Sequence, residues 1–302
     1  MNKLLKNIFT ALFLFLFLLN GCKDKGRIAK ENVIVKGSDT MVNLTLNWAE
    51  AFMKENPNIS IQVTGGGSGT GIASILNKTA DVANISRDLK SREFTKAGEL
   101  GVNPNLLKVA LDGIAIIVHP SCKVDTLSIE QIRDIFSGRI QNWKEVGGED
   151  KQIVLYGREN SSGTYEYFKQ VILNSETNNI KYDFATTTQV LQGTSSLAEA
   201  VSRDTRGIGY GGVGYFAKRN DLKILYIKTD KFKKAISPLV DGKLNYNVIW
   251  NGSYPLARYL YCLTNGEPKG AVAKYMNFVT SSEGQKIVEN MEYIPLPDSL
   301  SN

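Results

Sequence analysis

A short polar stretch, "GRENSSGTYEYF" at Gly157–Phe168, combines residue types that bind small anions. Arg158 carries a planar guanidinium that suits oxyanions, and a Ser-Gly-Thr triplet begins at Ser162. An aromatic run with helical spacing follows. Two interpretations are open. The hydroxyls either cap a helix that starts here, or they form a pocket in which the N–H groups of the helix start bind an anion.

Two earlier loops share this design. They are "GSDT" at residues 37–40 and "GGGSGTG" at residues 65–71, and each follows a predicted strand and opens a predicted helix. One such loop is weak evidence, because Ser and Thr commonly cap helices. Three in one chain, with Arg158 beside the third and Arg87 just after another strand, favour an anion site built from helix starts.

Patterns for nucleotide binding, catalysis and metal binding are missing from the sequence. A P-loop needs a lysine before its hydroxyl, but here Gly71 is followed by Ile72, and a dinucleotide fingerprint needs glycine where Thr70 stands. His119 is the only histidine, at the end of an apolar strand, and no C-x-x-C, H-E-x-x-H or EF-hand pattern occurs. We therefore expect a binding protein rather than an enzyme, with no metal and no cofactor.

Length and composition are those of an ordinary globular protein. The chain has 302 residues, which is long for a single core, so two lobes are expected. Its formal net charge is +6, without a basic run or a basic stripe interleaved with aromatics. Nucleic-acid binding is therefore not expected, whereas a mildly positive field suits an anionic ligand or an anionic membrane surface.

The first 22 residues are predicted to be a secretory signal. Lys3 and Lys6 precede an apolar run at Ile8–Leu19, which would span only about 18 Å as a helix, too short for a bilayer. The run ends in "LNGC", which resembles the lipobox of bacterial lipoproteins, in which the cysteine, here Cys22, is lipidated. Residues 23–29 are polar and are predicted to be a tether.

After the tether, strand-like and helix-like stretches alternate, which predicts an α/β protein with largely parallel sheets. The predicted strands are residues 32–37, 59–64, 80–86, 106–120, 151–157, 207–212, 222–228 and 254–265. The predicted helices are residues 38–57, 72–78, 91–101, 127–138, 161–173, 195–204, 269–279 and 282–291. Capping boxes are expected at Ser128 with Gln131 and at Ser196 with Glu199.

Two further expectations concern where the chain passes between the lobes and whether its two remaining cysteines are linked. The chain is expected to cross between lobes within residues 112–125 and again within residues 228–252. Cys122 and Cys262 either form a disulfide, which an exported protein permits, or are two unlinked small side chains.

Together these segments resemble the phosphate-binding lipoproteins of bacterial phosphate ABC transporters, the PstS-like family. The resemblance covers nearly the whole chain after the lipobox. It is carried in family order by "VKGSDTMVNLTLNWAEAFMKENP", "QVTGGGSGTGIASILN", "ADVANISRDL", "LSIEQIRDIFSGRIQNWKEVGG", "GRENSSGTYEYF", "GIGYGGVGY" and "YPLARYLYCLTN". It implies a type 2 periplasmic-binding-protein fold of two α/β lobes with mixed, mainly parallel sheets and a hinge of crossing strands. Lobe 1 would comprise residues 30–117 and 238–302, and lobe 2 residues 118–237.

The resemblance also implies a set of phosphate-binding residues and a role for the chain. Carried over to this sequence, the residues are Thr40, Met41, Ser68, Arg158, Ser162, Gly163 and Thr164. The protein would then capture inorganic phosphate between its lobes and deliver it to an ABC transporter permease. It would act as a monomer in the cell envelope, outside the cytoplasm, with a lipid anchor in a membrane.

One position departs from the family pattern. Some members carry an aspartate after the third strand that accepts the proton of monohydrogen phosphate, but here Ser86, Arg87 and Asp88 stand there, with Arg87 at the aligned position. A buried O–H needs an acceptor, whereas sulfate has no such proton and would be repelled by a carboxylate. Asp39 is our candidate acceptor and Asp88 the second, although a helix N-cap is an equally good interpretation of Asp39.

Three alternatives to phosphate capture remain open at this point. A binding protein for another oxyanion, such as sulfate or molybdate, is the nearest. A surface phosphatase is opposed by the single histidine and the missing metal pattern. A sensory or adhesive lipoprotein with a vestigial pocket is the third.

Overall fold

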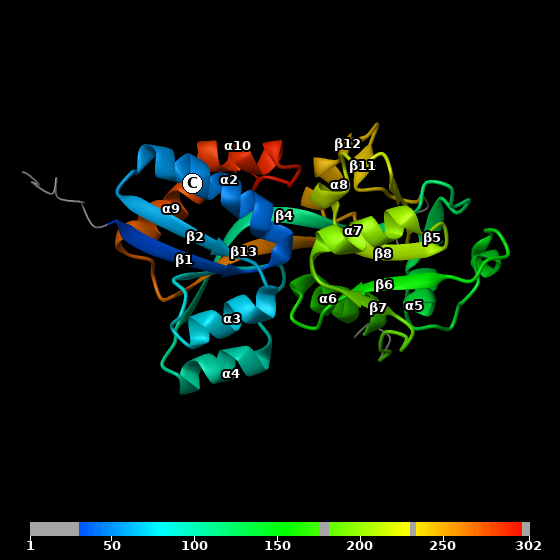
Figure 1. Cartoon of the computed structure of the whole chain (residues 1–302), viewed down its shortest axis with the longest axis horizontal. Coiled ribbons are helices and arrows are strands. Elements are labelled where there is room, and N and C mark those ends of the chain that lie inside the picture. The colour runs from blue at the N-terminus through cyan, green and yellow to red at the C-terminus, as the bar shows by residue number, and fades with distance from the viewer. Residues whose placement is uncertain (1–29, 175–180, 230–233, 298–302) are drawn as a thin grey trace, which may run out of the picture.

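The computed structural model describes residues 30–174, 181–229 and 234–297. The predicted signal, the lipobox with Cys22, and the tether lie outside the described residues. The described chain forms two α/β halves side by side, joined by the long strands β4 (Pro104–Val118) and β13 (Ala257–Asn265), as Figure 1 shows. This is the two-lobed, mixed α/β architecture that the resemblance implies.

The first half contains both the N-terminal part of the described chain and its C-terminal helices (Figure 1). Its strands are β1 (Glu31–Gly37), β2 (Ile59–Thr64) and β3 (Val82–Ile85). Its helices are the 3-10 helix η1 (Asp39–Met41), α2 (Val42–Glu55), α3 (Ser68–Leu76), α4 (Ser91–Glu99), α9 (Gly270–Thr280) and α10 (Ser282–Asn290).

The second half is built from the middle of the chain. Its strands are β5 (Thr126–Ser128), β6 (Val154–Arg158), β7 (Gln189–Leu191), β8 (Gly207–Gly212), β9 (Lys223–Ile224), β10 (Tyr226–Lys228), β11 (Leu239–Val240) and β12 (Lys243–Leu244). Its helices are α5 (Ile129–Phe136), η2 (Trp143–Val146), α6 (Gly163–Phe168), the π-helical turn η3 (Lys169–Leu173), α7 (Gly193–Arg203), η5 (Val213–Tyr215) and α8 (Tyr246–Trp250).

One mixed sheet runs through both halves in the order β2-β1-β3-β13-β4-β8-β6-β7, with β9 also paired to β4. Strands β1, β2 and β3 pair in parallel, as do β6, β7 and β8. The crossing strands supply the antiparallel pairs, because β13 runs antiparallel to β3 and β4, and β4 antiparallel to β8. Parallel strands place their carboxyl ends at one edge, so the loops after β1, β2 and β3 emerge together.

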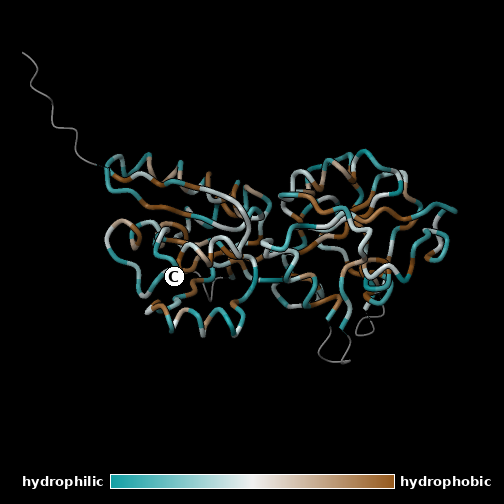
Figure 2. The backbone as a smooth tube through the Cα atoms, turned by 60° about the horizontal axis from the view of Figure 1, so that its bottom comes forward, coloured by the Kyte–Doolittle hydropathy of each residue, from teal (hydrophilic) through white to brown (hydrophobic). Residues whose placement is uncertain are grey.

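Separate hydrophobic cores stabilise the halves. Two clusters fill the first half, one around Trp48 and Phe52 and one around Ile72 and Ile75, whereas a larger cluster around Phe136 fills the second. Figure 2 shows hydrophobic segments in the interior of both halves. Strand β4 contributes to both sides: its residues 109–110 pack in the first half and its residues 114–118 in the second.

The crossing point follows from these contacts. Residues 104–113 of β4 pair with β13, and residues 114–118 pair with β8, so the chain crosses near Gly113. Helix α8 packs with the second half, because its Ile249 and the following Tyr254 are buried in the cluster around Phe136. We therefore propose that the return crossing is β13 itself, later than residue 238.

Of the two predicted capping boxes, one is present in the structure and the other is not. Ser128 Oγ accepts from the Gln131 N–H at 3.1 Å, and the Gln131 side chain accepts from the Ser128 N–H at 2.9 Å. The box predicted at Ser196 and Glu199 is wrong: α7 begins at Gly193, and no side chain caps it. Gly193, whose φ is +78°, begins the helix two residues before the predicted start at residue 195.

Cys122 and Cys262 are not linked to each other; Cys122 is half-buried in the second half and Cys262 is buried in β13. Among the described residues, no helix has the length and apolarity that crossing a membrane requires. Within the same ranges, no group of three or more His, Cys, Asp and Glu side chains could hold a metal ion.

Candidate anion-binding site

Three loops from the two halves meet where the paired strands β4 and β13 pass from one half to the other. The first-half loops are those that open η1 and α3, and the second-half loop opens α6 (Figure 1). The Oγ1 atoms of Thr40 and Thr164 lie 3.0 Å apart, and the Gly69 N–H donates to the Ser161 carbonyl at 3.0 Å. The hydroxyl-rich loops singled out in the sequence are therefore in direct contact.

Behind this contact lies a network of buried hydroxyls. Ser38 Oγ donates to Ser86 Oγ at 3.0 Å, and Ser86 Oγ lies 3.2 Å from Ser68 Oγ. The Ser86 N–H also donates to Ser68 Oγ. We call the five residues Ser38, Thr40, Ser68, Ser86 and Thr164 the hydroxyl cluster; each is at most 2% exposed.

Missing side chains allow the two halves to approach this closely. A Cβ on Gly163 would stand 2.2 Å from Ser68 Oγ and 2.5 Å from Ser86 Oγ. A Cβ on Gly67, whose φ is +87°, would stand 2.4 Å from the Ser161 carbonyl oxygen. A glycine is therefore needed at each of these two positions for the halves to make this contact.

Arg158, at the carboxyl end of β6, is 1% exposed and lies beside this contact. Its Nη1 donates to Thr194 Oγ1 at 2.8 Å, and its Nε and Nη2 donate to Glu159 at 3.0 and 2.9 Å. Nη2 also reaches Asp39 Oδ2 of the first half at 3.1 Å. Two carboxylates balance this buried guanidinium, which ties one half of the molecule to the other.

A second buried arginine, Arg258 on β13, contacts the hydroxyl cluster directly. Its Nη2 lies 3.1 Å from Thr164 Oγ1 and 3.5 Å from Thr40 Oγ1, and its Nη1 donates to the Ser86 carbonyl at 2.9 Å. Asp112 on β4 pairs with it, accepting from Nη2 at 2.7 Å and from Nε at 3.1 Å. Both side chains are buried.

Sequence reasoning missed Arg258 and Asp112. A signal was nevertheless present, since each is a charged residue within an otherwise apolar segment, in "ALDGIA" and "PLARYLY". Charged side chains are rarely fully buried unless they are paired, so two opposite charges in two buried strands indicate a pair.

The other predicted residues are placed as follows. Ser162 caps α6, with its Oγ accepting from the Tyr165 N–H at 3.2 Å, so the capping interpretation of the opening stretch is correct for this residue. Met41 is buried, and its N–H donates to the Ser38 carbonyl at 3.0 Å. Asp39 makes no capping bond; its Oδ1 accepts from the Gly66 N–H at 2.8 Å.

The loop after β3 differs from expectation in which side chain enters the cluster. Ser86 does so, whereas Arg87 forms a two-pronged ion pair with Glu93 at 2.8 Å on each side. Asp88 is exposed and accepts from the Tyr261 hydroxyl at 2.6 Å. Of the three residues considered there, Ser86 therefore enters the cluster, whereas Arg87, at the aligned position, does not.

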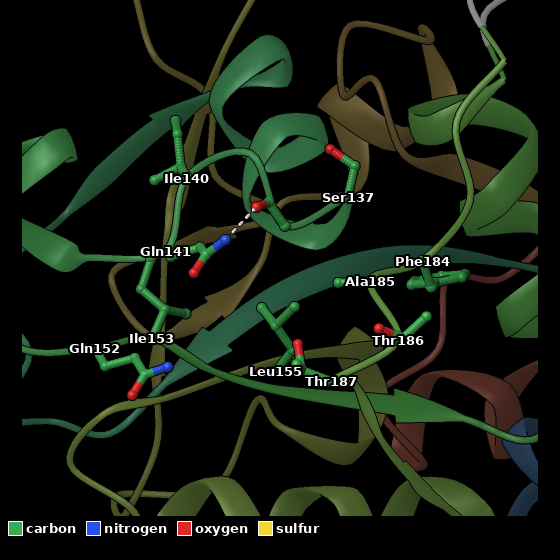
Figure 3. A pocket seen from close by; sticks show the side chains of 11 residues that line it. Ser137, Ile140, Gln141, Gln152, Ile153, Leu155, Phe184, Ala185, Thr186 and Thr187 are labelled. Carbon is green, nitrogen blue, oxygen red and sulfur yellow. Dashed lines mark hydrogen bonds between the residues drawn. The ribbon is translucent and has the colours of Figure 1, made fainter.

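Two hollows of the molecule are lined by other residues than the hydroxyl cluster. One of about 370 Å³ in the second half (Figure 3) lies beside the start of β6, where the Gln141 side chain donates to the Gly138 carbonyl at 2.9 Å. Another, of about 1100 Å³, lies between α4 and α6 and is lined by Arg87, Lys90, Arg92, Lys169 and Lys181 along with Asp88 and Glu166. Three of these cations are paired with carboxylates, Arg87 with Glu93, Lys90 with Glu166 and Lys169 with Asp183, so most of this positive charge is balanced.

Comparison with known proteins places the fold in a family. Residues 26–283 match the PBP superfamily domain. The chain is 32% identical to the phosphate-binding protein PstS of Pseudomonas aeruginosa, over 88% of this chain and 83% of that protein. The chain belongs to the PstS-like branch of the PBP superfamily. A second PstS-like relative, the phosphate-binding protein PstS of Bacillus subtilis, is 30% identical over 98% of this chain and 95% of its own length.

Solved structures agree with this PstS-like assignment. A phosphate ABC transporter substrate-binding protein from Clostridium perfringens, determined with bound phosphate, superposes with a TM-score of 0.74 at 27% identity. A phosphate transport receptor from Vibrio cholerae superposes with a TM-score of 0.68 at 26% identity. Each comparison covers 88% of this PstS-like chain and all of the solved chain.

Proposed function

We propose that the protein captures inorganic phosphate between its two lobes and delivers it to the permease of an ABC transporter. The observation that carries the proposal is the convergence of hydroxyls from both halves, Thr40 and Ser68 with Thr164, beside the buried Arg158 and Arg258. The PstS names of the relatives and the bound phosphate of the structural neighbour support it.

Binding would follow from the contacts on both sides of the cleft. The cluster hydroxyls now hydrogen-bond to one another, and each would exchange that neighbour for a phosphate oxygen. Because donors come from both halves, only the arrangement with the halves together satisfies every phosphate oxygen. Water would be expelled as the halves meet, and each charge-assisted hydrogen bond then contributes more than it would in water.

The residues proposed to touch phosphate are those implied by the family together with Arg258. Backbone N–H groups at the start of α6, at Gly163 and Thr164, would add donors to the side chains of Ser162 and Arg158. Met41 would contribute its N–H once this leaves the Ser38 carbonyl. This is capture rather than chemistry, so we propose no enzymatic turnover.

The cellular setting is proposed from the sequence and the family. The protein would act outside the cytoplasm as a monomer, held to a membrane by lipid on Cys22. A loaded protein would dock on the permease, which would force the halves apart and release phosphate. The polar residues 23–29 would leave the folded part free to reach that permease.

Isothermal titration of the purified protein with phosphate, sulfate and molybdate tests the proposal. We expect saturable binding of one phosphate per chain, with sulfate and molybdate much weaker. Tighter binding of sulfate or molybdate would make this a binding protein for another oxyanion. Turnover of a phosphate ester would indicate a phosphatase, and no binding of any of the three anions would leave a sensory role.

A further inference from the structure

To discriminate phosphate from sulfate, the site needs a carboxylate. In this chain the aligned position after β3, where some family members carry an aspartate, is Arg87 instead. Monohydrogen phosphate carries a proton that needs an acceptor when it is buried, whereas sulfate carries none. The position after β3 that faces the hydroxyl cluster is Ser86, whose hydroxyl is bonded to Ser38 and Ser68. A serine hydroxyl carries no charge, so it would not repel sulfate.

The other carboxylates near the contact between halves are already engaged. Asp39, 21% exposed, uses one oxygen on Arg158 and the other on the Gly66 N–H. Both oxygens of Glu159 accept from Arg158. Asp88 is exposed and bonded to Tyr261. None of these three has a buried oxygen ready to accept a proton from a ligand in the cluster.

Asp112 differs from these carboxylates in burial and in its free oxygen. Its side chain is 0% exposed, and Oδ2 receives both bonds from Arg258. Oδ1 has no hydrogen-bond partner in the described chain, while the backbone N–H groups of Gly113 and Val213 act to lower the pKa of the Asp112 carboxyl as a whole. A buried oxygen without a partner is costly, so it is a position where a ligand donor would be strongly favoured.

Geometry places this carboxylate at the edge of the cluster. A Cβ on Gly212 would stand 2.8 and 3.1 Å from the two Asp112 oxygens and 3.2 Å from Thr40 Cγ2. Asp112 and Thr40 therefore border the same small space, which exists because residue 212 has no side chain. On the other side, the Arg258 Nη2 bridges Asp112 to Thr40 and Thr164.

We propose that Asp112 accepts the phosphate proton and excludes sulfate, while Arg258, which Asp112 orients, acts as a second guanidinium for the anion. The inference rests on the proposed function. Burial raises the pKa of Asp112, opposed by the charge of Arg258 and its hydrogen bonds, and a carboxylate with raised proton affinity is a better acceptor. The specificity of the site would then come from the crossing strands instead of from the loop after β3.

Titration of the Asp112→Asn variant with phosphate and with sulfate tests the assignment. An amide can donate to a fully deprotonated oxyanion, so phosphate affinity should fall about ten- to a hundredfold while sulfate affinity rises. Equal weakening for both anions would mean that Asp112 only orients Arg258, and would overturn the role as acceptor. Unchanged discrimination would overturn it as well.

The matched control is Asp39→Asn, which removes the other candidate carboxylate. It should weaken both anions alike, through Arg158, and keep the preference for phosphate. Loss of that preference would assign the acceptor to Asp39 and overturn the inference, even if Asp112→Asn failed to fold. Wild-type protein that binds no phosphate would instead refute the proposed function itself, so the two failures are distinguishable.

Discussion

Arg158 holds carboxylates from opposite halves of the molecule, Asp39 in the first and Glu159 in the second. A lysine at this position would keep the charge but lose the planar fork that makes these bonds at once. Because a hydrogen bond between charged groups contributes about 1.5–3 kcal/mol, we expect Arg158→Lys to weaken phosphate binding about tenfold or more. Isothermal titration measures this change directly.

Arg87 offers the matched control, because it is also a buried arginine paired with a carboxylate after a strand. Arg87→Lys should lower the free energy of unfolding but leave phosphate affinity unchanged, since both Nη atoms of Arg87 donate to Glu93 and not to the hydroxyl cluster. Equal affinity in Arg158→Lys and the wild type would show that Arg158 serves the contact between halves and not the ligand.

Some residues of the candidate site could be predicted from the sequence, and others could not. Thr40, Ser68 and Thr164 were predictable because each follows the carboxyl end of a strand, where parallel topology gathers loops. Arg258 and Asp112 were not, since they lie within strands and not in loops, and only the antiparallel pairing of β13 with β4 brings them together. Register between strands 146 residues apart has no local signal in one sequence.

Among the elements, helix α4 shows how a surface helix is fixed to the edge of the site. The Glu93 side chain accepts from the Lys90 N–H at the helix start and pairs with Arg87. Burial raises the pKa of Glu93, but the hydrogen bonds and charges of Arg87 and Lys90 together outweigh burial and lower the pKa overall. The unfolded chain therefore binds this proton more readily than the folded protein does.

The sign of the pH effect follows from that difference. Glu93 stabilises the fold at pH values above its ordinary pKa, and this contribution is lost as the pH falls through the lowered value. We expect Glu93→Gln to be less stable than the wild type at neutral pH and to lose less stability between about pH 5 and pH 3. Urea unfolding at a series of pH values measures both effects.

Glu99→Gln on the same helix is the control, since Glu99 forms an exposed pair with Lys96 at 2.9 Å. Exposed pairs contribute little, so its stability should follow the wild type at every pH. A Glu93→Gln curve parallel to that of the wild type would show that the Arg87–Glu93 pair does not stabilise the fold.

Element types were more predictable than element boundaries. Periodic apolar patterns located α2, α9 and α10, and alternation of strands with helices indicated two α/β lobes. The start of α7 was mispredicted, because Gly193 sets it. The half to which α8 belongs depends on tertiary packing, and our proposal of the second half differs from the sequence expectation of lobe 1. Neither cause has a strong signal in a short window of sequence.

For the whole molecule, we expect the contact between the halves to control phosphate capture. At Gly163 this contact leaves no room for a side chain. Alanine would suit the start of α6, but its Cβ would stand 2.2 Å from Ser68 Oγ in the opposite half. We expect Gly163→Ala to fold normally and to bind phosphate at least tenfold more weakly, because the halves cannot approach fully.

Small-angle X-ray scattering separates this effect from a local loss of ligand contacts. If phosphate draws the halves together, the radius of gyration of the wild type should fall when phosphate is added, while that of Gly163→Ala should stay at its starting value. Gly98→Ala, in α4 with no atom within 4 Å of the new Cβ, should behave as the wild type does. A Gly163→Ala protein that compacts normally would place its loss of affinity in the ligand contacts, and the contact between halves would then not control capture.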